Sequence, residues 1–191
     1  SGYYMTIPET PTVVVKELYL RPSPLYHALL PTSLEANMYL TFVSQANIEE
    51  SLRKSYPFVS DISFVEKTFG ASVVVRVRPG GGEKIRNLIL FLLSFSVIKK
   101  VVVVDLDVDP HDLRDVEWAS ITRCSADRDM VIVQGIQGQP IDPQAGEGYR
   151  VTKIGIDATA EGKTREGRAV VSSGNDERIA KILEGVGGVD E

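Results

Sequence analysis

The sequence of 191 residues has few of the side chains that build disulfide frameworks or zinc sites. It contains one cysteine, Cys124, and two histidines, which excludes a disulfide framework and argues against a zinc site. A single cysteine fits a reducing, cytoplasmic setting. No run of about 18 uninterrupted apolar residues occurs, so we expect no transmembrane helix. The start of the chain lacks the basic and apolar regions of a secretory signal peptide, and we expect none.

The charge balance lacks the excess of basic residues that binding to nucleic acids needs. Lysine and arginine total 21, aspartate and glutamate total 26, and the formal net charge is −5. Phosphate contacts require concentrated Lys and Arg, so we expect no nucleic-acid partner. Hydrophobic residues make up 43% of the chain and charged residues 25%, which is the composition of a folded globular protein rather than a disordered one.

The first third of the chain predicts one strand followed by helices. Residues 12–20 (TVVVKELYL) are rich in β-branched side chains and predict a strand. Ser33 can N-cap a short helix that runs through Met38 and Leu40. Residues 45–55 predict an amphipathic surface helix that ends before a proline.

The middle of the chain predicts a strand pair and a buried helix. Residues 59–65 and 71–77 indicate two strands around Gly70. Residues 79–82 (PGGG) predict a turn, because the Lys-Ser/Thr pair of a phosphate-binding loop does not follow them. Residues 83–94 predict a helix that is apolar on most of its circumference and therefore deeply packed.

A strand, a helix and a second strand are predicted next. The β-branched run at residues 101–104 (VVVV) is typical of a strand covered on both faces, as in a parallel sheet. Asp109 is the predicted N-cap of a helix over residues 110–122, and residues 130–133 form the second strand. This order predicts a right-handed βαβ unit. Residues 134–174, rich in Gly, Gln and Asp, are interpreted as loop.

Three aspartates alternate directly after the first of these strands: Asp105, Asp107 and Asp109. Ligands bind at the carboxyl ends of the strands in open α/β sheets, so one interpretation is a Mg²⁺ or Ca²⁺ site. The other interpretation, which we favour, is that one aspartate caps the helix and the others pair with arginines. The candidate arginines are Arg114, Arg123 and Arg128.

The remaining polar candidates do not form a catalytic set. His111 is expected at an exposed position of the predicted helix, with Asp112 adjacent and without a serine nucleophile motif. Cys124 follows the helix C-terminus, where the dipole raises a thiol pKa, so we expect a small buried hydrophobe. Residues 135–143 follow the second strand and predict a binding loop at the carboxyl edge of the sheet.

Five segments of the sequence match, in chain order, the motifs of one known family. The most specific is residues 101–129, with the motifs DLDVD, RDVEWA, TR and DRD. The supporting segments are residues 1–4 (SGYY), 25–28 (LYHA), 138–143 (GQPIDP) and 153–159 (KIGIDAT). In these motifs the chain resembles the C-terminal part of the UbiD family of decarboxylases, the 3-polyprenyl-4-hydroxybenzoate decarboxylase-like enzymes.

The resemblance implies an α/β fold of three parts. Residues 1–30 would be the end of the split β-barrel, flavin-binding domain, with its remnant strand. Residues 31–174 would be the C-terminal α/β domain of UbiD type, with a partly parallel sheet. Residues 175–191 would form a C-terminal helix and tail that serve oligomerisation.

The resemblance also implies a lyase that removes CO₂ from an aromatic or α,β-unsaturated carboxylic acid. Such enzymes use prenylated FMN, Mn²⁺ and often K⁺, with an arginine and two glutamates of the barrel domain as catalytic groups. None of these three groups can be placed in this chain. We therefore expect neither catalytic residues nor metal ligands here, no cofactor on this chain alone and no independent decarboxylase activity.

What this chain can carry, by the resemblance, is part of the substrate pocket. Gln139 and Ile141 match family positions that line the pocket, and Met38 and Leu40 are expected to face it. Aromatic-acid decarboxylases of the family can have a phenylalanine where Gln139 stands, so the glutamine argues against a cinnamate-like substrate.

The implied partners are a small unsaturated or aromatic acid, further copies of the chain in a homodimer or hexamer, and a UbiX-type flavin prenyltransferase that supplies the cofactor. Two alternatives stay open. One is a stand-alone, non-catalytic assembly or binding subunit of UbiD-like ancestry. The other is a metal-dependent phosphotransfer domain built on the three aspartates.

Overall fold

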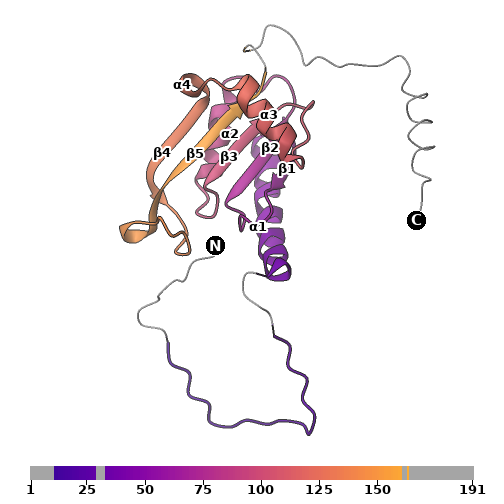
Figure 1. The fold of residues 1–191 in the computed structure, drawn as a ribbon, viewed down its shortest axis with the longest axis vertical. Helices are drawn as coiled ribbons and strands as arrows, with labels where there is room; N and C mark the ends of the chain where they lie inside the picture. The colour runs from indigo at the N-terminus through magenta and orange to yellow at the C-terminus, as the bar shows by residue number, and fades with distance from the viewer. Residues whose placement is uncertain (1–10, 29–32, 161–162, 164–191) are drawn as a thin grey trace, which may run out of the picture.

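The structure is a computed structural model that describes residues 11–28, 33–160 and 163 (Figure 1). Its centre is a five-stranded sheet with the strand order β1-β2-β3-β5-β4. The strands are β1 (Val59–Phe64), β2 (Ser72–Val77), β3 (Lys100–Val104), β4 (Met130–Gln137) and β5 (Arg150–Ala158). The helices are α1 (Leu34–Ser55), α2 (Lys84–Leu93), α3 (Leu113–Arg123), α4 (Ala126–Asp129) and a 3-10 turn, η1 (Glu147–Tyr149).

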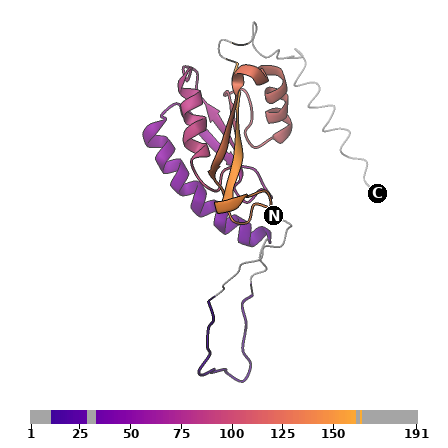
Figure 2. The ribbon, with the colours of Figure 1, turned by 90° about the vertical axis from the view of Figure 1, so that its left-hand side faces the viewer.

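Helices cover both faces of the sheet, which gives three layers (Figure 2). On one face, Leu52 of α1 and Leu88 of α2 lie in a core cluster with side chains of β1 to β4 and are at most 1% exposed. On the other face, Ala119 of α3 packs in a second cluster with valines of β2 and β3. This is the α/β architecture with a partly parallel sheet that the sequence predicts.

The middle of the sheet is parallel and its edges are antiparallel. β3 runs parallel to β2 on one side and to β5 on the other, while β1 and β4 are antiparallel edge strands. All four valines of residues 101–104 are at most 2% exposed, which confirms the prediction of a strand covered on both faces. The predicted β1–β2 pair and the predicted buried helix, α2, are also confirmed.

The predicted βαβ unit that joins residues 101–104 to residues 130–133 is wrong. β5 lies between β3 and β4, and β4 runs antiparallel to it, so β3 and β4 are neither neighbours nor parallel. The βαβ unit of neighbouring parallel strands is instead β2–α2–β3. The interpretation of residues 134–174 as loop is wrong for two parts of that range: β4 continues to Gln137, and residues 150–158 form the interior strand β5. Residues 138–149 are loop apart from η1, and residues 161–162 and 164–174 lie outside the described residues.

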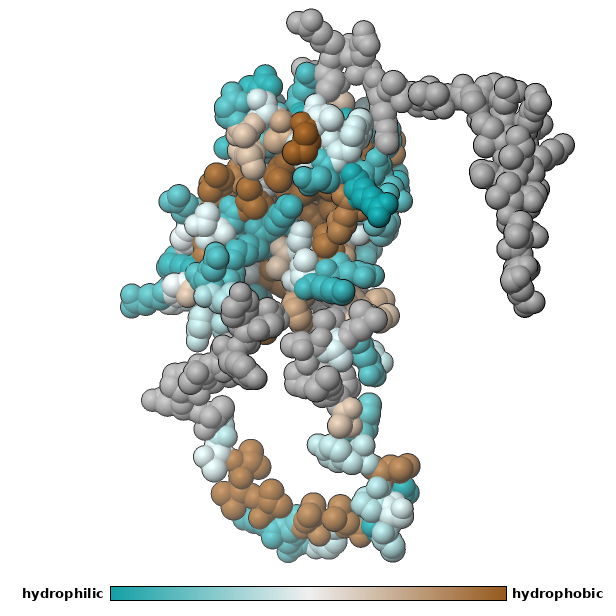
Figure 3. All heavy atoms as spheres, in the orientation of Figure 1, coloured by the Kyte–Doolittle hydropathy of each residue, from teal (hydrophilic) through white to brown (hydrophobic). Residues whose placement is uncertain are grey.

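Two predictions for the N-terminal part are corrected. A single helix, α1, replaces the two predicted helices; Ser33 is its N-cap as predicted, and its Oγ accepts from the backbone N–H of Ala36 at 3.2 Å. Residues 12–20 form no strand, because a strand needs a hydrogen-bonded neighbour and this segment runs away from the sheet (Figure 1). Figure 3 shows its apolar side chains on the surface, and Tyr19 is 86% exposed.

Helix α3 begins three residues later than predicted. Asp112, not Asp109, is the N-cap, and its carboxylate accepts from the backbone N–H of Arg114 at 2.9 Å. Asp109 instead closes a turn before the helix, where its carboxylate accepts from the backbone N–H of His111 at 2.9 Å. The predicted C-terminal helix at residues 175–185, and the tail to residue 191, lie outside the described residues.

None of the helices in the described ranges is long and apolar enough to cross a membrane.

Candidate functional site

The aspartates after β3 form ion pairs with one buried arginine. Arg123, whose side chain is 4% exposed, donates from Nη1 to Asp105 at 3.0 Å and from Nη2 to Asp107 at 2.5 Å. Its guanidinium also lies 4.9 Å from the centre of the Trp118 ring. The pairing interpretation is thus confirmed for Asp105 and Asp107.

The same cluster gives no support to a metal site. Among the described residues, no three His, Cys, Asp or Glu side chains lie close enough to hold a metal ion. Burial raises the pKa of Asp105, and the backbone N–H of Ala160 and the guanidinium of Arg123 oppose that shift. The hydrogen bond to Asp107 raises the pKa of Arg123 further.

The cysteine and the histidine of this region do not form a reactive pair. Burial and the nearby carboxylate of Asp129 raise the pKa of the Cys124 thiol, in the predicted direction, but the side chain is partly exposed rather than buried. His111 lies in the turn before α3 with its Nε2 3.6 Å from a carboxylate oxygen of Asp61. A reactive thiolate needs a lowered pKa, so Cys124 does not point to nucleophilic catalysis.

At the carboxyl ends of the parallel strands, a hollow of about 230 Å³ lies between α2, α4 and β5. Three of its charged side chains pair with one another: Lys163 Nζ lies 2.9 Å from Asp157 and 3.4 Å from Asp129. Asp157 also accepts from the backbone N–H and the hydroxyl of Thr159. These contacts give Asp157 and Thr159, from the segment at 153–159, a role in closing this edge of the sheet.

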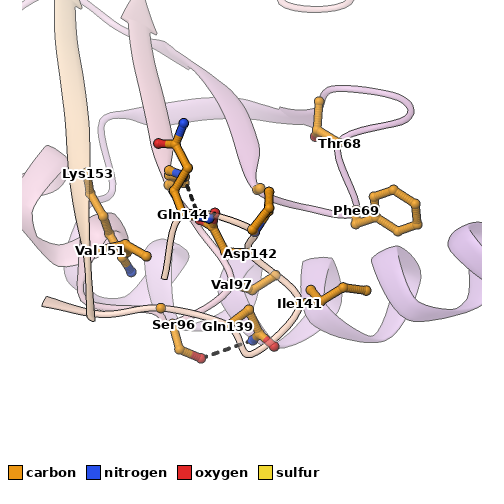
Figure 4. Close-up of a pocket in the computed structure, with 14 residues that line it drawn as sticks. Thr68, Phe69, Ser96, Val97, Gln139, Ile141, Asp142, Gln144, Val151 and Lys153 are labelled. Atoms are coloured by element: carbon orange, nitrogen blue, oxygen red, sulfur yellow. Dashed lines mark hydrogen bonds and ion pairs between the residues drawn. The ribbon is translucent and has the colours of Figure 1, made fainter. Parts of the chain in front are cut away.

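A second hollow lies at the opposite edge, beside the amino ends of β2, β3 and β5, and has a volume of about 290 Å³ (Figure 4). Residues of β5 and three further segments form it: residues 68–71 before β2, residues 96–99 before β3, and residues 138–144 after β4. We call residues 138–144 the pocket loop. The apolar lining residues are Phe69, Ala71, Val97, Ile141, Pro143 and Val151.

The sequence predicts this loop as a binding loop but places it at the wrong edge. The prediction assumes that β4 runs parallel to β3, which would put the residues after it at the carboxyl edge. Because β4 is antiparallel to β5, its carboxyl end meets the amino ends of the parallel strands. The pocket loop therefore lies opposite the three aspartates, not beside them.

Two side-chain contacts fix the pocket loop to the segment before β3. Lys99 Nζ lies 2.6 Å from Asp142 Oδ2, and Gln139 Nε2 donates to Ser96 Oγ at 3.2 Å (Figure 4). Asp142 Oδ1 accepts from the backbone N–H of Gln144 at 2.9 Å. Burial pushes the pKa of Asp142 upward, but the hydrogen bonds from Lys99 and Gln144 outweigh it, and the net shift is downward.

A buried lysine of β5, Lys153, also lines this pocket. It is 1% exposed, and its Nζ donates to the carbonyl oxygens of Leu93 at 3.0 Å and Phe95 at 2.7 Å. Burial lowers the pKa of this ammonium. Sequence reasoning missed it, because Lys153 and Gly155 stand at buried positions of the strand's alternation, where apolar side chains are expected.

The structure brings two of the four predicted pocket residues together. Gln139 and Ile141 both line the pocket, and Ile141 is 41% exposed. Met38 lies on α1, is 64% exposed and is not among the lining residues. The side chain of Leu40 lies outside the described part of the chain. Ser96, Lys99 and Lys153 are lining residues that the sequence did not predict.

Residues 37–158 match the family model of the 3-octaprenyl-4-hydroxybenzoate carboxy-lyase C-terminal domain. The chain belongs to the UbiD family. It is 32% identical over 163 residues to the anhydromevalonate phosphate decarboxylase of Methanocaldococcus jannaschii, a match that covers 83% of this chain and 38% of that protein. The match begins and ends inside the predicted domain of residues 31–174, whose boundaries stay predictions.

Solved structures agree with this assignment. The UbiD-class enzyme HmfF from Pelotomaculum thermopropionicum, in complex with FMN, has a TM-score of 0.72 and 28% identity; the match covers 83% of this chain and 36% of HmfF. The vanillic acid decarboxylase of Sedimentibacter hydroxybenzoicus in its closed form has a TM-score of 0.62 and 27% identity, covering 73% of this chain and 31% of the enzyme. The chain thus spans less than two fifths of the length of these relatives.

Proposed function

We propose that this chain is the C-terminal domain of a prenylated-FMN-dependent decarboxylase that acts on an α,β-unsaturated or aromatic carboxylic acid. In this proposal it supplies one wall of the substrate pocket, through Gln139 and Ile141, and a surface for assembly into a homo-oligomer. The observation that carries the proposal is the pocket loop. Side chains that the family resemblance assigns to the substrate close an apolar hollow of about 290 Å³, and two polar contacts anchor them there.

The lining of the pocket fits the conjugated part of a flavin or its substrate. Phe69, Val97 and Ile141 offer apolar surface, and the amide of Gln139 offers a donor and an acceptor. When bound, the cofactor would supply the electron sink for loss of CO₂. The described residues contain no donor set for Mn²⁺, so no step is assigned to a metal on this part of the chain.

The contribution of this chain's own residues is physical. Decarboxylation turns a charged carboxylate into neutral CO₂. An apolar wall disfavours the charged group more than the neutral product, because burying an unpaired charge costs free energy. The apolar side chains of the pocket, Ile141 among them, also keep water from the substrate, and the Gln139 amide orients it.

Among the acids used in the family, a small unsaturated acid fits this chain best. Relatives that match over more than four fifths of this chain are named anhydromevalonate phosphate decarboxylase, which points away from quinone biosynthesis. A name of that form denotes a dehydrated, small, phosphorylated acid rather than an aromatic one. The polar amide of Gln139, in place of an aromatic side chain, agrees with that choice. Supply of the cofactor by a UbiX-type prenyltransferase belongs to the same proposal.

The test is Gln139→Phe in the complete protein, with kcat/KM measured for a small unsaturated acid and for a phenylacrylate. We expect the ratio of the two values to move toward the phenylacrylate by tenfold or more, since about 1.4 kcal/mol of differential binding corresponds to tenfold. Gln134→Phe is the matched control: Gln134 lies exposed on β4 and does not line the pocket.

An unchanged ratio in Gln139→Phe, or an equal change in the control, would remove Gln139 from the substrate pocket. A complete natural protein that decarboxylates none of the acids would favour the alternative, a non-catalytic subunit of UbiD-like ancestry.

A further inference from the structure

We infer that Lys153 is a positioning residue for the substrate pocket: through the last carbonyl groups of α2, its ammonium holds Ser96 where it accepts a hydrogen bond from Gln139. The inference rests on the proposed function for what Gln139 does to substrate. The relay itself, from Lys153 to the pocket loop, is a statement about this structure and can be tested without turnover.

The first observation is a buried charge that packing does not explain. Lys153 lies on the interior strand β5, is 1% exposed, and donates hydrogen bonds to two carbonyl oxygens. An ammonium is costly to bury, and an apolar side chain of similar volume would fill the same space without that cost. The charge therefore acts on the structure through the two carbonyl groups that it binds.

Those groups are the end of a helix. The last carbonyl groups of a helix lack intrahelical partners and carry partial negative charge, so a cation there is favourable. Leu93 is the last residue of α2, and the Phe95 carbonyl lies two residues beyond it. Phe95 also accepts from the backbone N–H of Ile98 at 3.1 Å. Lys153 thus ties β5 to the turn in which α2 ends.

The second observation is that this turn anchors the pocket loop. Ser96 follows Phe95 directly, and its Oγ accepts from Gln139 Nε2 at 3.2 Å. Lys99, at the end of the same segment, pairs with Asp142. Figure 4 shows Ser96 and Gln139 pointing toward each other below the pocket, with Lys153 on the strand beside them. Both contacts that hold the loop therefore start from the segment whose beginning Lys153 fixes.

Direct binding of substrate by Lys153 is the competing role. With 1% of the residue exposed and two of its protons given to carbonyl groups, the ammonium offers little surface to a ligand. Its effect on the pocket is therefore transmitted through Ser96.

The experiment measures amide hydrogen exchange in the full 191-residue chain, comparing wild type with Lys153→Met. The reporters are the loop amides of Asp142 and Gln144, both hydrogen-bonded within the loop. We expect their exchange to be at least roughly tenfold faster in the variant, as the loss of hydrogen bonds to a charged group predicts. Lys100→Met, which removes an exposed lysine at the start of β3, is the control and should leave both amides unchanged.

Unchanged loop exchange in a folded Lys153→Met protein would overturn the inference, as would an equal acceleration in the control or throughout β2. If the methionine variant does not fold, Lys153→Gln is measured instead. Its neutral amide can donate to one of the two carbonyl groups, so the loop amides should exchange at an intermediate rate. Wild-type protection of the loop in that variant would also overturn the inference.

A double-mutant cycle in the complete protein then tests the relay. If Lys153 acts through Ser96, the rise in KM caused by Lys153→Met and Ser96→Ala together should be about that of the larger single change. Rises that multiply would show that the two residues act independently and would overturn the relay. Faster loop exchange with KM unchanged for every acid would leave the positioning role standing and refute the proposed function of the pocket.

Discussion

Replacing Arg123 by methionine should expose how much of this fold depends on the charges after β3. Arg123 holds Asp105 and Asp107 together and lies against the Trp118 ring. Methionine keeps most of the apolar stem and removes the guanidinium. The variant therefore leaves the two carboxylates facing each other without their common cation.

The expected loss follows from the burial of the three groups. Removing one member of a buried ion pair costs about 3–5 kcal/mol when the remaining charge stays in the protein interior. Asp105 has 21% of its side chain exposed and belongs near that range, but Asp107 is 42% exposed and water screens it. We therefore expect Arg123→Met to lower the free energy of unfolding by about 2–4 kcal/mol at pH 7.

The loss of stability in Arg123→Met should depend on pH in a defined direction. Burial already raises the pKa of Asp105 in the folded protein, and loss of the guanidinium should raise it further. Between the unfolded-state pKa, about 3.9, and that raised value, the folded variant binds more protons than its unfolded chain. Its stability therefore increases as the pH falls, and the difference from wild type should be smaller near pH 4.5 than at pH 7.

The assay is denaturant unfolding followed by circular dichroism at both pH values. Arg114→Met, an exposed arginine at the start of the same helix, is the control and should change stability by less than about 0.5 kcal/mol. Adding Asp105→Asn to Arg123→Met should recover part of the loss at pH 7. The reasoning fails if the loss is the same at both pH values, or if the control costs as much.

Two further changes test packing and the pocket loop. A Cβ at Gly155 of β5 would lie 2.0 Å from Ile89 Cγ2 of α2, so Gly155→Ala should cost about 1–3 kcal/mol in urea unfolding. Gly146→Ala, where the nearest atom is 3.7 Å away, should be nearly neutral, and equal effects would contradict the close packing of α2 on β5. Asp142→Asn should cost about 1 kcal/mol at pH 7 by breaking the pair with Lys99. The folded-state pKa of Asp142 is lowered, so its contribution to stability is present above about pH 4 and is lost as the pH falls through the folded-state pKa. The stabilities of wild type and variant should therefore converge in acid. A difference that stays constant with pH would refute this.

Local signals in the sequence were sufficient to predict those elements whose side chains are buried on most sides. The four valines of residues 101–104 and the apolar circumference of α2 predict their elements, because such side chains are stable only between other layers. Ser33 likewise identifies the start of α1 through chemistry confined to one turn. These features depend on near neighbours in the chain.

Strand direction and the place of β5 could not be predicted in that way. β5 pairs with β3, about fifty residues earlier, and nothing within residues 150–158 records that distant partner. The buried Lys153 and Gly155 interrupt the apolar pattern and hide the strand. Only the fold explains both residues. Lys153 donates to a carbonyl group at the end of α2, and the absence of a side chain at Gly155 leaves room for Ile89.

The location of the candidate site follows from the direction of one edge strand. At the carboxyl edge, where open α/β sheets usually bind ligands, several charged side chains pair with one another, as in the pairs Arg123–Asp105 and Lys163–Asp157. β4, being antiparallel, returns the chain to the opposite edge and delivers the pocket loop to the amino ends of the parallel strands. The apolar hollow forms there because the loop is anchored by Lys99 and Ser96 rather than packed against the sheet. A parallel β4 would have carried Gln139 and Ile141 away from that anchor, so the antiparallel course of this strand is a structural precondition of the proposed substrate wall.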